Sequence, residues 1–178
     1  MTGKSICIVC AAALLAACNA QEADNRANTV VPSAETHNAA TAAAPLTGDQ
    51  ALAAAKEREE HMEAFGDATK KVHNELKSSS PEIATIQKAA AQINSLAPNL
   101  LTWFPKGTAE GVGKSRAKAE IWDKAEDFAI KAHDFQTAAN QFNVAAQSGD
   151  LGEIRTTFDA LGKSCKACHD LYRAPKKD

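Results

Sequence analysis

The clearest helical period in this chain lies at residues 121–148, IWDKAEDFAIKAHDFQTAANQFNVAAQS. Apolar side chains recur there at steps of three and four residues, and large ones alternate with small ones. The series is Ile121, Ala125, Phe128, Ala132, Phe135, Ala139, Phe142 and Ala146. This spacing puts all of them on one face of a helix, and the small residues let a second helix approach closely. The stretch therefore predicts one long amphipathic helix inside a helical bundle.

Three more amphipathic helices are expected, at residues 47–76, 80–97 and 150–172. Nowhere does the sequence alternate apolar and polar residues over the length of a strand, so no strand is expected. Four helices with mostly short connections predict an all-α fold, an antiparallel up-and-down four-helix bundle.

Capping residues in the sequence predict where these helices begin and end. Thr47 and Gln50 fit a capping box at the start of the first helix. Ser80-Pro81 predicts the start of the second, because a hydroxyl can cap the helix and Pro suits its first turn. Gly149 should end the third helix, and Asp150 should cap the fourth.

Length and composition narrow the class of protein. The 178 residues suit one folded domain with appendages, and a net charge of -2 argues against a nucleic-acid partner. Only 5% of residues are aromatic, and many core positions are Ala, so the core of the bundle would be thin. A large apolar cofactor between the helices would supply the missing volume. A loop rich in Gly and Pro at residues 98–115 is expected to cover that core with apolar side chains.

The first 18 residues read as an export signal. Lys4 precedes an apolar run that is too short to span a bilayer as a helix. The run ends in Leu-Ala-Ala-Cys at residues 15–18, which resembles the lipobox of bacterial lipoproteins. This resemblance implies that residues 1–17 are removed and that Cys18 is lipidated. An ordinary secretory signal, with Cys18 incidental, is the alternative.

The segment that follows is predicted to be a tether. Residues 18–46 are polar or small and lack an apolar period, so we expect a lipidated, disordered linker before a folded domain at 47–178. The protein would then lie in the periplasm, anchored to a bacterial membrane through its lipid. Asn19 favours the outer over the inner membrane, because Asp commonly retains lipoproteins in the inner one.

The chemistry is concentrated at Cys165-Lys166-Ala167-Cys168-His169. C-x-x-C-H is the attachment signature of haem c. Two thiols three residues apart lie on one helix face, where they can bond the two vinyl groups of a porphyrin, and the adjoining imidazole can bind the iron. A thioredoxin-like dithiol would need a strand-to-helix setting, and a zinc site would need a further pair of ligands. We therefore expect a bundle that encloses a covalently bound haem.

A haem motif near the end of the last of four helices resembles the class II c-type cytochromes, the cytochrome c′ and cytochrome c-556 group. The resemblance covers residues 47–173. Its carriers are GKSCKACH at 162–169, DLYR at 170–173, FPKGT at 104–108, Ile121-Trp122 and REEHM at 58–62. It implies that Arg58 lies beside the haem propionates and that Met62 occupies the distal face of the iron, opposite His169. It also makes a homodimer an expectation, since dimers are common in this group.

The distal residue separates the expected functions. If Met62 binds the iron, the haem is six-coordinate and low-spin, as in a carrier of electrons between redox partner proteins. A lipid-anchored periplasmic electron carrier, rather than an enzyme, is therefore expected. If Met62 only fills space, as buried Met often does, the iron is five-coordinate and binds NO or CO. A haem subunit of a larger redox complex is a third reading.

Overall fold

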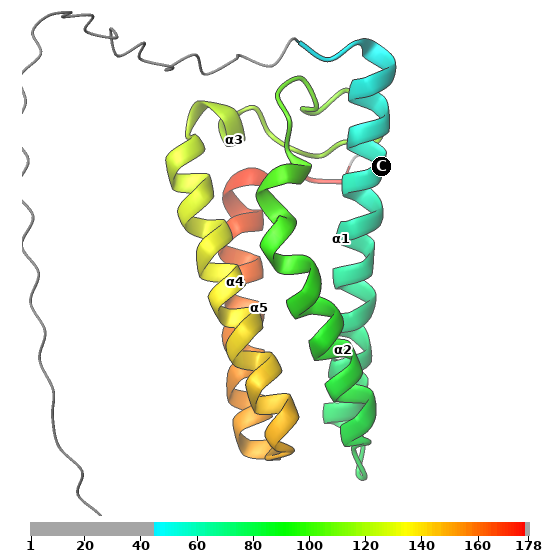
Figure 1. The fold of residues 1–178 in the computed structure, drawn as a ribbon, viewed down its shortest axis with the longest axis vertical. Helices are drawn as coiled ribbons and strands as arrows, with labels where there is room; N and C mark the ends of the chain where they lie inside the picture. The colour runs from blue at the N-terminus through cyan, green and yellow to red at the C-terminus, as the bar shows by residue number, and fades with distance from the viewer. Residues whose placement is uncertain (1–44, 177–178) are drawn as a thin grey trace, which may run out of the picture. The chain divides into compact units, whose positions relative to one another are not determined.

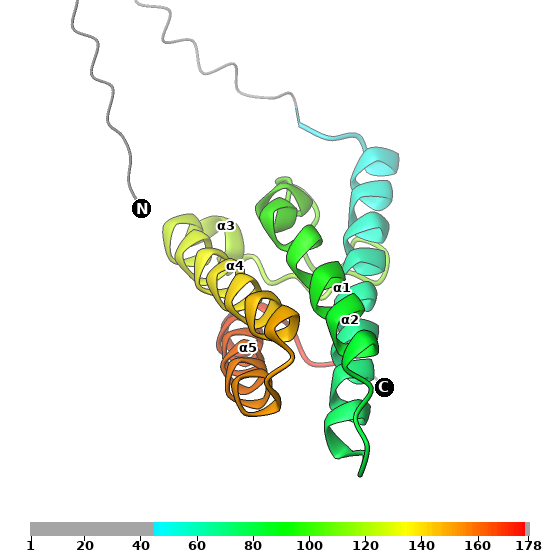
Figure 2. The ribbon, with the colours of Figure 1, turned by 60° about the horizontal axis from the view of Figure 1, so that its bottom comes forward.

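The computed structural model describes residues 45–176, and Figures 1 and 2 show their path. The predicted signal peptide at 1–17, the lipidation site Cys18 and nearly all of the predicted tether at 18–46 lie outside these residues. The described elements are α1 (Gly48–Lys77), α2 (Ile83–Leu96), η1 (Ala97–Trp103), α3 (Glu120–Asp123), α4 (Ala125–Ser148) and α5 (Leu151–Tyr172).

The caps of α1, α4 and α5 confirm the start and stop signals. Thr47 Oγ1 accepts a hydrogen bond from the Gln50 amide at 3.3 Å, and the Gln50 side chain accepts one from the Thr47 amide at 2.9 Å. Gly149 ends α4 in the left-handed region, with φ of 77°. The Asp150 carboxylate then accepts from the Glu153 amide at 2.8 Å and caps α5.

The expected start of α2 at Ser80-Pro81 is wrong. The helix begins at Ile83 behind Glu82, whose side chain makes no capping hydrogen bond. The Glu82 amide instead donates to the carboxylate of Glu75 at 2.9 Å. A side chain of α1 therefore fixes the turn between the two helices, which a local cap signal cannot reveal.

Two further segments differ from expectation. Residues 97–103, expected within a helix end and a loop, form the 3-10 helix η1, with Pro98 in its first turn and Trp103 buried. The predicted third helix is broken at Lys124, where φ of -120° and ψ of 47° leave the helical region. The short α3 precedes this break and the long α4 follows it. The apolar series crosses the break because Ile121 is also buried, in a small cluster with Phe128 and Tyr172.

The four long helices form the predicted antiparallel bundle, and the chain direction alternates from one helix to the next (Figure 1). The closest backbone packing joins α4 to α5, α1 to α2 and α2 to α4. The largest fully buried apolar side chains are Phe142, Ile86, Ile93, Ile154, Leu161 and Val72. Within residues 45–176, no helix is both long and apolar enough to span a bilayer.

α1 and α5 are not among the closely packed helix pairs. Cavities lined by side chains of both helices lie between them.

Candidate haem site

A cavity of about 530 Å³ lies between α1, α5 and the connection from η1 to α3. Its volume is within the range of pockets that bind small molecules. All five residues predicted for the haem line it. These are Arg58, Met62, Cys165, Cys168 and His169. The fold therefore brings the REEHM stretch of α1 to the C-x-x-C-H motif of α5.

The walls of this cavity are largely apolar. Phe65, Leu100, Phe104, Phe128 and Phe135 contribute to its lining. Phe65 contacts Phe135 edge-on at 5.1 Å between ring centroids, and Phe104 contacts Phe128 in the same way at 4.9 Å. These edge-to-face contacts fix the aromatic side chains around an opening of stable shape.

The two cysteines carry free thiols on one side of α5. Burial raises the pKa of Cys165, and it raises the pKa of Cys168 to about 11 with a further contribution from the neighbouring Cys165. Both groups are therefore protonated thiols at neutral pH. Thiols are the form in which haem c forms its thioether links, since each link adds S–H across a vinyl group.

His169 lies one residue beyond Cys168 and is also half-buried. Burial, together with the positive charges of Arg173 and Arg116, lowers the pKa of His169 to about 4. The imidazole is therefore neutral at physiological pH, which leaves one ring nitrogen free to bind a metal.

Arg173 is a residue of this site that sequence reasoning missed. It lines the cavity and its charge lowers the pKa of His169, whereas the sequence analysis included it only in the DLYR stretch at 170–173 and gave it no role. Its amide donates to the His169 carbonyl at 3.1 Å, at the end of α5. The signal was its position four residues after His169, because residues at that spacing share a helix face.

Arg58 is buried, with 5% of the residue's surface exposed. Its Nη1 donates to the Trp103 carbonyl at 3.1 Å and to the Thr108 hydroxyl at 2.7 Å. Its Nη2 donates to the Thr108 carbonyl at 2.7 Å and to the Ser115 hydroxyl at 2.8 Å. Arg58 therefore ties α1 to the connection between η1 and α3. Sequence analysis did not predict this contact.

These partners of Arg58 are neutral oxygens, and the cation also lies 4.9 Å from the Phe104 ring centroid. Burial lowers the pKa of the guanidinium from its usual value. A buried cation among neutral partners would gain from a nearby anion. A haem propionate would supply one, so the propionate role of Arg58 stays a prediction that the site can accommodate.

Met62 is half-buried, lines the cavity and packs against the main core cluster. It is the only methionine in residues 45–176. Its position fits both readings of the distal face, because the same side chain can bind iron or fill space. Its role as an iron ligand stays a prediction.

Tyr172 fixes the end of α5 beside the cavity. Its hydroxyl donates to the Asp127 carboxylate of α4, and its ring meets Phe128 edge-on at 5.2 Å. Burial and the hydrogen bond to Asp127 together raise the pKa of Tyr172 to about 12. The sequence analysis included Tyr172 in the DLYR stretch at 170–173 but did not indicate this polar partner.

The residues of this cavity fit a covalently held haem. They supply two thiols on one helix face, a neutral imidazole next to them, apolar walls and a buried cation without a carboxylate among its hydrogen-bond partners. Fold and site together define a four-helix bundle protein that carries a c-type haem.

Comparison with known proteins agrees. A family model described as cytochrome c′ matches residues 53–173. Cytochrome c′ from Pararhodospirillum photometricum is 35% identical over 116 residues, which cover 65% of this chain and 92% of that protein. Cytochrome c-556 from Agrobacterium tumefaciens is 32% identical over 122 residues, covering 68% and 97%. The chain belongs to the cytochrome c′ family, and its cofactor is covalently bound haem c.

Two solved structures are similar across the bundle. One is a cytochrome c′ with ligand-controlled dimer dissociation, which matches with a TM-score of 0.67 and 28% identity over 74% of this chain and all of that one. The other is a nitric oxide complex of a cytochrome c prime variant from Alcaligenes xylosoxidans. It matches with a TM-score of 0.64 and 31% identity, over 71% of this chain and 97% of that one.

Proposed function

We propose that this protein binds a small diatomic gas, NO or CO, on the distal face of a five-coordinate haem c. The observation that carries the proposal is an apolar cavity that faces the C-x-x-C-H motif, in a fold shared with a solved nitric oxide complex. When bound, the haem supplies an iron with one open coordination position. We rank gas binding above the electron transfer that the sequence analysis favoured, because a solved structure that matches this chain is a nitric oxide complex.

The chain's own residues have distinct parts in this proposal. Cys165 and Cys168 would hold the macrocycle against α5, and neutral His169 would bind the iron from that side. Arg58 would face the propionates while it closes the η1–α3 connection over the cavity. Met62 would pack over the open face and limit the size of the ligand. The aromatic walls would exclude water.

Met62 also supports a second function. If its sulfur binds the iron, the site is six-coordinate and low-spin, and the protein transfers electrons between periplasmic redox partners without enzymatic turnover of its own. The observation in favour is that Met62 lines the haem cavity and that a relative bears the different name cytochrome c-556.

An optical and electron paramagnetic resonance spectrum of the holoprotein separates the two functions. For gas binding, the ferric wild type is high-spin, the ferrous form binds CO, and Met62→Leu leaves the spin state unchanged. Phe65→Leu, which changes another apolar wall residue, is the matched control. A low-spin wild type that turns high-spin only in Met62→Leu would overturn gas binding and support electron transfer. A mature chain without porphyrin mass on the peptide with both cysteines would overturn both.

Export and anchoring remain part of the proposal. Residues 1–17 would be removed, Cys18 would carry lipid, and residues 18–46 would link it to the domain at 47–178, in the periplasm and on the outer membrane. Mass spectrometry of the mature N-terminus tests the lipid, and Cys18→Ala should release the haem domain from membranes. A homodimer, known for the solved cytochrome c′ named above, is tested by sedimentation with and without CO.

A further inference from the structure

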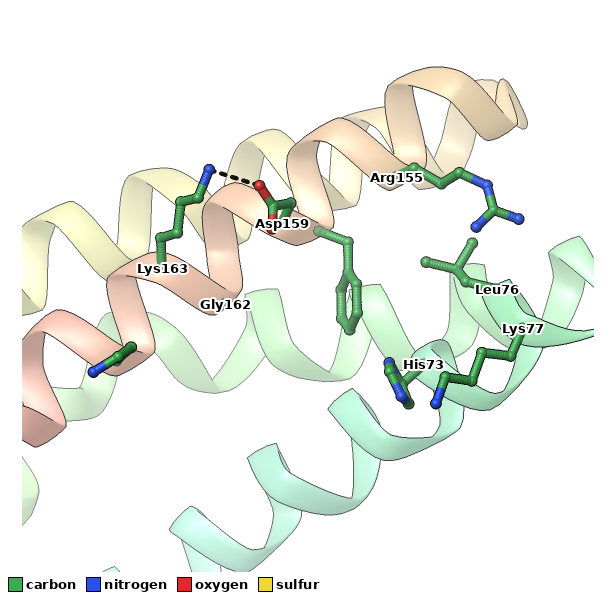
Figure 3. A pocket seen from close by; sticks show the side chains of 9 residues that line it. His73, Leu76, Lys77, Arg155, Asp159, Gly162 and Lys163 are labelled. Atoms are coloured by element: carbon green, nitrogen blue, oxygen red, sulfur yellow. Dashed lines mark ion pairs between the residues drawn. The ribbon is translucent and has the colours of Figure 1, made fainter.

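A second cavity, of about 490 Å³, lies between the C-terminal half of α1 and the middle of α5. It shares no lining residue with the haem cavity. Figure 3 shows that its labelled side chains come from both helices, with His73, Leu76 and Lys77 on α1 and Arg155 and Lys163 on α5. The cavity exists because α1 and α5 are not closely packed here.

The floor of this cavity is apolar. Leu76 is buried and belongs to the main core, and the half-buried Phe158 packs against that core. The Phe158 ring lies 5.3 Å from the ring of buried Phe142. The floor is therefore held in place by the core, and an apolar group that covered it would be removed from water.

The rim of the cavity is cationic. Lys77 comes from α1, and Arg155, Lys163 and Lys166 come from α5. Among the described residues that line the cavity, Asp159 is the only carboxylate, and it pairs with Lys163 at 2.7 Å. Lys166 pairs with Asp170 outside the cavity. Lys77 and Arg155 lie on opposite walls, and neither forms an ion pair with a carboxylate of residues 45–176.

We propose that this cavity binds a small amphipathic organic anion, an aliphatic or aromatic carboxylate. The apolar body would cover Leu76 and Phe158, and the carboxylate would lie between Lys77 and Arg155. Inorganic phosphate has no apolar body that could cover Leu76 and Phe158. The apolar floor and the cationic rim together therefore favour a small molecule that has both an apolar body and a negative charge.

The site adjoins the haem attachment without being part of it. Gly162 and Lys166, which line the cavity, flank Cys165 on α5. Gly162 lies three residues before Cys165, a rise of about 4.5 Å along a helix. The proposal goes beyond gas binding and does not depend on which ligand the iron takes.

Calorimetric titration of the holoprotein tests this site. Three probes are compared. Octanoate has both an apolar chain and a negative charge, 1-octanol has the chain without the charge, and inorganic phosphate has charge without the chain. Octanoate should bind saturably with one site per chain, and the other two should bind at least roughly tenfold more weakly, a difference of about 1.4 kcal/mol. Absence of octanoate binding, or equal binding of phosphate or octanol, would overturn the proposal.

Matched variants locate the binding. Lys77→Gln and Arg155→Gln should each weaken octanoate binding about twofold to fivefold, as expected for exposed charge pairs. Lys88→Gln, the same change at an exposed position of α2, should leave it unchanged. An equal loss in Lys88→Gln would mean that only net charge matters, and the site would be wrong. A shift of the haem Soret band on addition of octanoate would show that octanoate binds at the iron, and it would also overturn the proposed site.

Discussion

Arg58 offers the sharpest test of how the fold closes over the haem cavity. Its four hydrogen bonds join α1 to Trp103, Thr108 and Ser115, and Thr108 is fully buried. The connection also has backbone hydrogen bonds of its own, and residues 116–118 bond to residues 172–174, whereas the Arg58 side chain joins it to α1. We expect Arg58→Ala and Arg58→Lys both to destabilise the holoprotein and to loosen the connection.

The size of the stability loss depends on which hydrogen-bond partners of Arg58 keep another hydrogen bond in the variant. A hydrogen bond from a charged donor contributes about 1.5–3 kcal/mol. The Thr108 carbonyl still accepts from Ser115 at 2.9 Å, and the Thr108 hydroxyl still donates to Pro105 at 2.9 Å, so the loss is not four full bonds. The Trp103 carbonyl loses the Arg58 donor. We therefore expect Arg58→Ala to lower the free energy of unfolding by about 3 kcal/mol.

Arg58→Lys separates the charge from the fork of donors. Its ammonium keeps the charge for a propionate but cannot reach oxygens on both sides of the guanidinium, so we expect a loss of about 2 kcal/mol. Urea denaturation followed by circular dichroism measures both losses. The exposed Arg155→Ala is the control and should change stability by less than about 0.5 kcal/mol.

Trypsin provides the second measurement, because Lys106, Lys114 and Arg116 lie in the connection. Cleavage after these residues should become faster in both Arg58 variants and stay unchanged in Arg155→Ala. If Arg58→Lys matches the wild type in stability and in cleavage, the guanidinium does not hold the connection, and its role is confined to charge.

Three further perturbations test the core, a helix end and a buried hydroxyl. Phe142→Ala should lower the free energy of unfolding, measured by urea denaturation, by about 3–5 kcal/mol because the ring is fully buried. The control Val144→Ala changes a side chain that is 62% exposed and should lower it by less than about 0.5 kcal/mol. Similar losses in the two variants would contradict this packing. Gly149→Ala should lower the free energy of unfolding by about 1 kcal/mol, because φ of 77° strains a residue that has a Cβ. The added Cβ would lie 3.8 Å from the Ile83 side chain, an ordinary contact, so the loss comes from the backbone. An unchanged midpoint of urea denaturation would contradict that conformation. Tyr172→Phe should cost about 1 kcal/mol at pH 7 because it removes the bond to Asp127. The wild type should also lose stability as pH rises from 10 towards 12. The reason is that the Tyr172 phenol ionises near pH 10 in the unfolded chain and only at about 12 in the folded one. The same alkaline loss of stability in Tyr172→Phe would exclude Tyr172 as its source.

Much of this protein could be predicted from local sequence. Helix periodicity depends only on which residues recur every three or four positions, so the long helices and the Thr47, Gly149 and Asp150 caps followed directly. The haem motif is equally local, since one turn of α5 carries both thiols and the imidazole. The resemblance to class II c-type cytochromes, rather than helix spacing, indicated Arg58 and Met62, and the structure has both of them lining the haem cavity.

What the tertiary structure decided concerns partners distant in sequence. The acceptors of Arg58 lie 45 to 57 residues away, so no spacing on α1 could identify them. The bond between Tyr172 and Asp127 likewise joins α5 to α4 across 45 residues of sequence. The cavity beside Leu76 and Phe158 exists only because α1 and α5 do not pack closely there. Periodicity gives the faces of each helix, but the distance between two faces is set by packing of the whole bundle.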